Sequence, residues 1–300
     1  MRFIFGSLIA LLVAAFSVEP NTTGFGYEMI SNRLNSLQGL ESDLLTYTND
    51  TARQLTKLVE LMTRLQLSPG SGAGSGSPST QPAPVGASCR NVPSRQSGIY
   101  RINPDYPFHE PMTVLCDQQY EGGGWTVIQR RTDGSVDFFR DWQDYKAGFG
   151  TLHGEFWLGL DRIHRLTNVA PHELAVLLED FDGAKATARY QRFRIAAETL
   201  NYAVVELGSC SPCGAGDAMR IHLNESFSTY DRDRSKAAFN CAAAFKGGWW
   251  FYRCHRCHLN GQYLKGKLTE AQDSHGIMWM DFRGDKYSLK ASTMMIRPIK

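Results

Sequence analysis

The chain has 300 residues, enough for one or two domains and for a sizeable buried core. Its 32 basic and 30 acidic residues give a formal net charge of +2, and Lys and Arg form no long block. This balance argues against a partner that is nucleic acid or an anionic membrane surface, because both require an extended basic field.

Residues 1–17 have the pattern of a secretory signal peptide. Arg2 precedes an apolar run over residues 3–16, and small residues follow at the spacing that a signal peptidase needs. The alternative is a membrane anchor, but the run is shorter than the roughly 20 residues of a spanning helix. We therefore expect a secreted, extracellular protein with no membrane span. Three N-glycosylation acceptors agree with this route: Asn21, Asn49 and Asn224.

Residues 27–67 are expected to form a helix. Apolar residues recur in alternating steps of four and three, a heptad pattern whose middle is polar: Ile30, Leu34, Leu37, Leu44, Leu55, Leu58, Met62 and Leu65. The pattern favours a short coiled coil that assembles a homo-oligomer, and the alternative is an amphipathic helix folded back on its own domain. Residues 68–88, rich in Gly, Ser and Pro, are predicted to be a linker, which supports the coiled coil.

Residues 89–300 are predicted to form an α+β domain with a central antiparallel sheet. Short apolar and aromatic runs alternate with Gly-rich turns, as is typical of strands: 112–116, 125–130, 156–160, 174–181, 203–207, 276–282 and 294–298. The best helical segment covers residues 161–166.

Residues 228–261 combine three kinds of chemistry. Asp231 and Asp233 stand at alternate positions, as oxygen ligands of a hard cation often do. Cys241 and Cys254 flank a short loop that a disulfide would close. Side chains with aromatic rings lie between and after them: Phe245, Trp249, Trp250, Phe251, Tyr252 and His255. Together these features predict a small-ligand recognition site.

The motifs of this stretch are STYDRD, NCA, GGWW, CH and LNG, in that order. Upstream stand SGIYRI at 97–102, GGGWTVIQRR at 122–131 and GEFWLGLDRIH at 154–164, and YSLKASTMMIRP stands downstream at 287–298. In this order and spacing the motifs resemble the fibrinogen-related domain over roughly residues 89–300. The resemblance implies an N-terminal subdomain, a sheet-bearing middle and a loop-rich C-terminal subdomain that carries the site. Ficolins, tachylectins, angiopoietins, angiopoietin-like proteins and tenascins share this domain, so a fold and a site are implied but not one function.

The resemblance also implies two disulfides among the seven cysteines, Cys89–Cys116 and Cys241–Cys254. The second closes a loop of about a dozen residues, worth roughly 3 kcal/mol in the loop-entropy model. It would hold the turn that follows Cys254.

Cys210, Cys213 and Cys257 depart from the family's pattern. With Cys254 they form two CxxC pairs, which in a cytosolic protein would suggest zinc. In a secreted protein an extra disulfide among the three is favoured over zinc. One thiol then remains, and it is either free or joins two chains.

A calcium site is implied by the resemblance at Asp231 and Asp233, completed by the backbone carbonyls of Ser235 and Ala237. The chain has no EF-hand loop. Many members have a further acidic or amide residue where Arg234 and Ser235 stand here. The charges of Arg232 and Arg234, both nearby, would lower the affinity for calcium.

The recognition pocket of lectin-type members lies beside this loop. Its floor corresponds to Arg253, Cys254 and His255, and the peptide bond before the cysteine is often cis in the family. A histidine in a constrained turn has little packing reason to be there, so His255 either contacts a ligand or stabilises the turn.

Members that bind acetyl groups surround the ligand methyl with aromatic rings. One ring corresponds to Phe245, and two others fall near Asp273 and Asp285, which are not aromatic. This departure argues against N-acetyl recognition, and an acidic pocket would instead suit an ammonium or guanidinium group.

Motifs of hydrolases, zinc proteases and phosphate-binding loops are missing, so an enzyme is not expected. The leading hypothesis is a secreted oligomeric recognition protein whose heads bind glycans or acetylated surface groups with calcium, in innate immunity. The alternative is an angiopoietin-like ligand whose head binds a cell-surface receptor. A matrix or adhesion protein is a third class, but the repeat modules usual there are not present.

Overall fold

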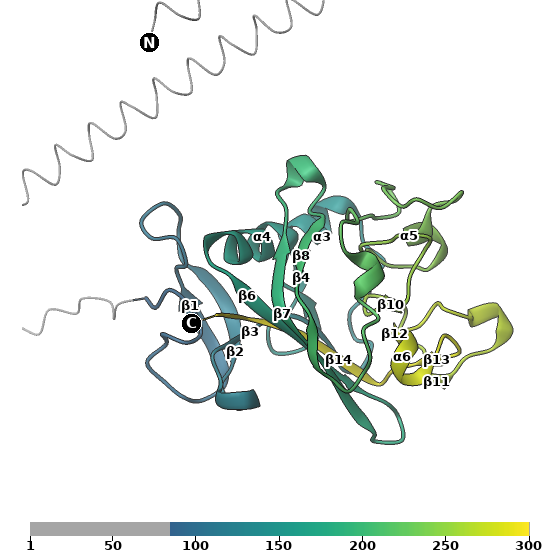
Figure 1. Cartoon of the computed structure of the whole chain (residues 1–300), viewed down its shortest axis with the longest axis horizontal. Helices are drawn as coiled ribbons and strands as arrows, with labels where there is room; N and C mark the ends of the chain where they lie inside the picture. Colours follow the sequence, from purple (N-terminus) through teal and green to yellow (C-terminus); the bar gives the residue numbers. More distant parts are fainter. Residues whose placement is uncertain (1–84, 300) are drawn as a thin grey trace, which may run out of the picture. The chain divides into compact units, whose positions relative to one another are not determined.

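The computed structural model describes residues 85–299 (Figure 1). The predicted signal peptide, the coiled-coil helix, most of the linker, and the acceptors Asn21 and Asn49 lie outside these residues. Within them, no helix has both the length and the apolar character needed to cross a membrane. The described part forms one ten-stranded sheet and two small two-stranded sheets.

The main sheet is antiparallel throughout, which confirms the predicted fold class. Its central path runs, in spatial order, through β1 (Gly98–Ile102), β2 (Met112–Asp117), β3 (Trp125–Arg131), β14 (Ala291–Pro298), β6 (His172–Glu179), β7 (Lys185–Ile195) and β8 (Val204–Leu207). β4 (Phe149–Gly150) pairs with β5 (Phe156–Trp157), which pairs with β3, and β9 (Cys210–Cys213) pairs with β7. β14 therefore joins the N-terminal strands to β6 and β7, as Figure 1 shows.

Helices are short in the described residues. They are α3 (Trp142–Ala147), α4 (Leu160–Val169), α5 (Cys241–Ala244) and α6 (Met280–Arg283), with 3-10 turns η1 (Tyr120–Gly122), η2 (Glu198–Leu200), η3 (Arg220–His222) and η4 (Glu270–Gln272). The two small sheets pair β10 (Cys257–His258) with β12 (Met278–Trp279) and β11 (Gly266–Lys267) with β13 (Tyr287–Ser288). The C-terminal subdomain thus consists mainly of loops.

Two predicted strands are wrong in part, and several strands were not predicted, among them β1 and the eleven-residue β7. The run 156–160 ends as a strand at Trp157, and 276–282 is a strand only over β12 before α6 begins. β7 was missed because its sequence, KATARYQRFRI, is largely polar. Strands pair with both edges of β7, but only one of its two faces packs against the core. Only the side chains on that face are therefore buried, among them Tyr190 and Phe193.

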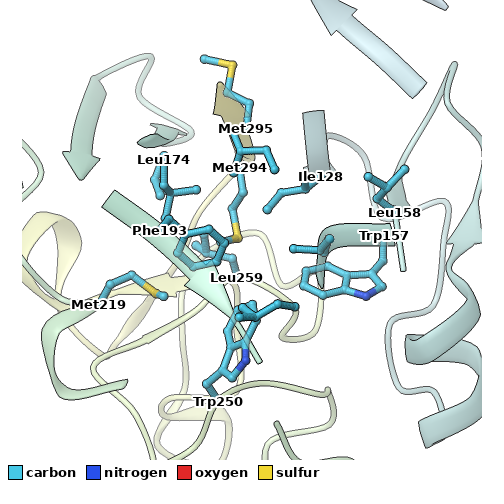
Figure 2. Close-up of a cluster of buried hydrophobic side chains, with 14 of the residues drawn as sticks. Ile128, Trp157, Leu158, Leu174, Phe193, Met219, Trp250, Leu259, Met294 and Met295 are labelled. Carbon is cyan, nitrogen blue, oxygen red and sulfur yellow. The ribbon is translucent and has the colours of Figure 1, made fainter. Parts of the chain in front are cut away.

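The core connects the sheet to the C-terminal loops. Figure 2 shows Met294 and Met295 of β14 and Phe193 of β7 in one cluster with Trp250 and Leu259, which come from the loops. The rings of Phe193 and Trp250 lie 6.2 Å apart. Each large apolar side chain buried in this way stabilises the fold by roughly 1.5–3 kcal/mol. The loops that carry the site are therefore mounted directly on the sheet.

Candidate recognition site

Buried polar side chains of β3 fix the loop that follows the predicted pocket turn. Gln129 Nε2 donates to the Leu259 carbonyl at 2.9 Å, and Arg131 Nη1 donates to the Gly261 carbonyl at 2.7 Å. Both side chains are fully buried. Because an unpaired buried polar group is costly, these bonds strongly favour one position of the loop.

Arg131 has a buried counter-charge in Glu155, with Nε and Oε1 3.5 Å apart. Glu155 also accepts hydrogen bonds from the N–H groups of residues 132–134 and of Val136. Burial alone would raise the pKa of Glu155, but the Arg131 charge and these N–H groups hold it below its usual value. The end of β3 is thereby anchored by an ionised pair.

The two aspartates predicted to bind calcium are exposed and keep oxygen atoms available. Asp231 Oδ1 accepts from the Trp142 N–H at 3.0 Å and from the Thr229 hydroxyl at 2.6 Å. Asp233 Oδ1 accepts from the Ser235 N–H at 2.9 Å. Within residues 85–299 the second oxygen of each carboxylate accepts no hydrogen bond from the protein.

The two backbone oxygens of the predicted calcium site, those of Ser235 and Ala237, accept no backbone hydrogen bond from the described residues. This part of the chain holds no cluster of three His, Cys, Asp or Glu side chains placed for a metal, so calcium here would depend on the two carbonyls. Two carboxylates with two carbonyls fit calcium in kind.

Arg232, between the aspartates, is engaged elsewhere. Its guanidinium lies 4.0 Å from the ring centre of Trp142, donates to Asn201 Oδ1 at 3.0 Å and lies 3.5 Å from Glu198. Because Glu198 partly neutralises its charge, Arg232 should lower the affinity for calcium less than its place between the aspartates suggests.

The aspartate loop lies beside the predicted pocket turn. The Lys236 N–H donates to the Tyr252 carbonyl at 2.9 Å, and the Tyr252 N–H donates to the Cys254 carbonyl at 2.8 Å. The Arg253–Cys254 peptide is cis, as the resemblance implied. Both implied disulfides, Cys89–Cys116 and Cys241–Cys254, are present.

His255 lies among aromatic rings with its ring nitrogens shielded from solvent. Its ring centre is 4.7 Å from that of Phe245, 5.8 Å from Phe251 and 5.2 Å from His258. Neither ring nitrogen has a hydrogen-bond partner in the described residues. Burial lowers the pKa of His255 to about 3, and the nearby His222 and His275 add to this effect. The imidazole is therefore neutral at physiological pH.

The ring that lies against Phe245 in the segment around Asp273 is His275, which the sequence analysis did not single out. The two ring centres are 5.3 Å apart. His275 Nδ1 is 2.7 Å from the Asp273 carbonyl, and the Ser274 N–H donates to the Asp285 carbonyl at 3.1 Å. The segments of Asp273 and Asp285 thus lie side by side, and the ring that contacts Phe245 belongs to His275, two residues after Asp273.

An exposed aromatic patch adjoins the aspartate loop and was also missed. We define it as the half-buried Phe139 with Tyr230 and Lys246, which contact its ring, and the exposed Phe239 nearby, whose neighbour Asn240 donates from Nδ2 to the Tyr230 carbonyl at 2.9 Å. The rings of Phe139 and Tyr230 lie 4.8 Å apart, and Lys246 Nζ is 4.8 Å from the centre of the Phe139 ring. Tyr230 is 41% and Phe239 55% exposed. The sequence signal was an aromatic residue at each end of a polar loop.

The structure shows the bonding state of the three remaining cysteines. Cys210 and Cys213 form a disulfide, as favoured over zinc, and Cys257 is a free thiol with no exposed surface. Burial raises the pKa of Cys257 well above its ordinary value. A bond from Cys257 to a second chain would require this part of the core to open. Asn224, the acceptor within the described residues, is exposed.

Comparison with known families places these features in context. Residues 87–299 match the family model of the C-terminal globular domain of fibrinogen beta and gamma chains. The chain is 42% identical over 266 residues to human angiopoietin-related protein 6, covering 86% of this chain and 56% of the relative. It is 44% identical over 205 residues to the mouse protein, covering 68% and 44%. The chain thus spans about half the length of the curated relatives it matches.

Solved structures with a similar fold come from the same family. The fibrinogen-like globe domain of human ANGPTL6 matches with a TM-score of 0.68 and 44% identity, over 74% of this chain and 99% of that domain. A lamprey fibrin D-dimer, complexed with the peptide Gly-His-Arg-Pro-amide, matches with a TM-score of 0.67 and 30% identity, over 91% of this chain and 92% of that one.

Proposed function

Because the chain belongs to the family of fibrinogen C-terminal globular domains, we propose that it is a secreted ligand whose head binds a cell-surface receptor protein. Its likeness to angiopoietin-related protein 6 over 86% of its length favours a receptor ligand over a lectin. The observation that carries the proposal is the exposed aromatic patch beside the aspartate loop.

The aromatic patch has the character of a protein interface. Aromatic residues, Phe and Tyr among them, are enriched in protein interfaces, and Tyr is also enriched among the residues that dominate binding energy. Phe139 and Tyr230 already pack on each other at 4.8 Å. Fewer rotamers then remain to be fixed when a partner binds, which lowers the entropic cost of association.

Calcium is the proposed structural cofactor of this surface. Asp231 and Asp233, with the carbonyls of Ser235 and Ala237, would hold the ion, whose role is to order the loop. Tyr230 and Phe239 stand at the two ends of this loop, so ordering it would fix the patch. Addition of a chelator should therefore lower the melting temperature of the wild-type head and should leave an Asp231→Ala head unchanged.

Oligomerisation through residues 27–67 belongs to the same proposal. Several heads on one stalk raise the effective concentration of the second binding event, so weak single sites give strong overall binding. Deleting residues 27–67 should yield a monomer in light scattering, and an unchanged mass would exclude the coiled coil.

Binding of the full-length protein to intact cells, measured by flow cytometry, tests the receptor proposal. Binding should disappear after protease treatment of the cells and should resist free N-acetylglucosamine. Tyr230→Ser with Phe239→Ser should lower binding by at least about tenfold, since two contact side chains are lost. The matched control is Tyr106→Ser with Phe108→Ser, which removes two exposed aromatic residues from the β1–β2 loop.

Equal binding by the two double variants would contradict a role for the aromatic patch. Binding that survives protease treatment but is displaced by the free sugar would contradict a protein receptor.

A glycan-binding function is the second candidate, favoured by the rings of Phe245, His255 and His275. The rings of His255 and His275 both contact that of Phe245. His275 thus supplies a ring from the segment of Asp273, where the sequence analysis expected none. Retention on an acetylated resin in calcium, with elution by N-acetylglucosamine and by chelator, would support it. A Phe245→Ala head should then lose retention, whereas a wild-type head that is never retained would exclude this function.

A further inference from the structure

The Cys210–Cys213 disulfide differs from the other two disulfides of the head. It lies on β9, which pairs only with β7, and both of its cysteines are partly exposed. The four cysteines of the other two disulfides are buried. Thiol–disulfide exchange requires a thiolate to reach a sulfur atom, so the three disulfides are unequal targets for a reductant.

The Cys210–Cys213 disulfide also closes a much shorter loop. Its cysteines are 3 positions apart, against 13 and 27 for the other two. A shorter loop constrains the unfolded chain less, so opening it costs the fold less. Reduction at this position is therefore compatible with a folded head.

Backbone hydrogen bonds hold β9 independently of the disulfide. The Ser209 carbonyl accepts from β7 at 3.1 Å on one side, and the Ala215 N–H donates to β7 at 2.8 Å on the other. Between them, Cys210 and Cys213 both stand in register with β7. The two thiols would stay near each other after reduction, so that the bond can form again.

The segment after β9, residues 214–222, leads to the recognition site. Gly216 has a φ of +80° and packs against Asp281 so closely that a Cβ atom there would lie 2.2 Å from the Asp281 Cβ. Asp281 forms an ion pair with Arg256, the residue after His255. A change at β9 thus has a short route of direct contacts to the pocket turn.

We propose that the Cys210–Cys213 disulfide is a thiol-exchange site, at which a dithiol reductant of the thioredoxin-like class breaks the disulfide and makes residues 214–222 more mobile, while β9 stays paired with β7 and the head stays folded. This goes beyond receptor binding and does not depend on it.

The exchange balances with the reductant as the donor of two electrons and two protons. One thiolate of the reductant attacks a sulfur of the disulfide, forming a mixed disulfide and releasing the other cysteine as a thiolate, which takes up a proton. The second thiol of the reductant then attacks the mixed disulfide. The reductant leaves oxidised, and Cys210 and Cys213 remain as thiols.

The first test uses the full-length protein in buffers with a rising ratio of reduced to oxidised dithiothreitol, without denaturant. Free thiols are alkylated with iodoacetamide and mapped by peptide mass spectrometry. Cys210 and Cys213 should be alkylated at ratios where the other four disulfide cysteines are not, and returning the protein to oxidised buffer should abolish their labelling. Cys257 is an internal control, because its buried thiol reacts only if the core opens.

The second test measures amide hydrogen exchange. Residues 214–222 should exchange at least about tenfold faster in the selectively reduced protein than in the oxidised protein, while β3 stays unchanged. Cys210→Ser with Cys213→Ser should reproduce this change, and Ser209→Ala with Ser211→Ala, which alters the same edge but keeps the disulfide, should not. If the double serine variant fails to fold, the reduced wild-type protein supplies the same measurement.

Labelling of Cys241, Cys254 or Cys257 at the same ratio as Cys210 would overturn the proposal, since reduction would then accompany unfolding. Unchanged exchange of residues 214–222 after selective reduction would overturn it as well. Neither readout involves a receptor, so its failure is distinct from failure of the proposed function.

Discussion

The main sheet and the C-terminal loops of the head are stabilised in different ways. In the sheet, long ladders of backbone hydrogen bonds repeat along the strands that pair with β14, so no single side chain carries the arrangement. In the loops the strands are only two residues long, and position depends on a disulfide, two buried β3 side chains and a few tryptophans. Single substitutions should therefore matter more in the loops, which carry the recognition site, than in the sheet.

Trp250→Ala should have the largest effect. Its indole is fully buried against Phe193, and its Nε1 donates to the Tyr202 carbonyl at 2.8 Å. Loss of the ring should lower the free energy of unfolding by about 4 kcal/mol. Urea unfolding of the head measures this, with Tyr106→Ala as a control that should change it by less than about 0.5 kcal/mol.

A loss below about 1 kcal/mol for Trp250→Ala would contradict the view that this residue joins the loops to the sheet.

Removal of the Cys241–Cys254 disulfide should come next. Its loop of 13 positions predicts a loss of about 3 kcal/mol in the chain-entropy model. The Cys210–Cys213 disulfide, with 3 positions, should cost only about 2 kcal/mol. Paired Cys→Ser variants, compared by urea unfolding, sharpen the contrast, and a reversed order would show that strain or packing outweighs loop length.

The free energy of unfolding should depend on pH through a buried histidine in each of the two regions. Burial lowers the pKa of His172 in β6 and of His222 beside the site to about 4, from 6.5 in an unfolded chain. Between these values only the unfolded state takes up a proton at each ring, so stability is full above pH 6.5 and is lost as the pH falls. Each histidine should contribute a slope of about 1.4 kcal/mol per pH unit in this window.

Unfolding by guanidinium chloride across this window measures the slope. His172→Gln and His222→Gln should each lower the slope by about 1.4 kcal/mol per pH unit, because one fewer proton is taken up on unfolding. A slope that neither variant alters would mean that both rings become protonated in the folded head.

Asn240→Ala should have the smallest effect of the series. Asn240 Oδ1 accepts from the Ala243 N–H at 3.0 Å and begins α5, next to Cys241. Loss of this N-cap should cost about 1 kcal/mol, with Asn240→Asp as the matched variant that retains an acceptor. Equal thermal stability of the two variants would show that the cap contributes nothing.

Prediction from sequence succeeded where a local pattern or a specific motif was sufficient. β3 and β6 are apolar runs, and the fibrinogen-related motifs located the aspartate loop and the turn at Cys254. β7 was missed because its polar face obscures a buried one. His275 and the aromatic patch were missed because their neighbours come from distant parts of the chain, so that neither the ring contact with Phe245 nor the exposure of Tyr230 is visible in local sequence.

The place of β14 in the sheet has a consequence for how the head is made. This strand contacts β3 on one side and β6 on the other, pairing Met295 with both Val127 and Ala175. It is also the last strand of the domain to emerge from the ribosome, so its two neighbours must wait with unpaired edges until synthesis of the domain is complete. Such edges invite pairing with other chains. A chain released before Ala291 would therefore be a target for chaperones and quality control rather than a smaller working head.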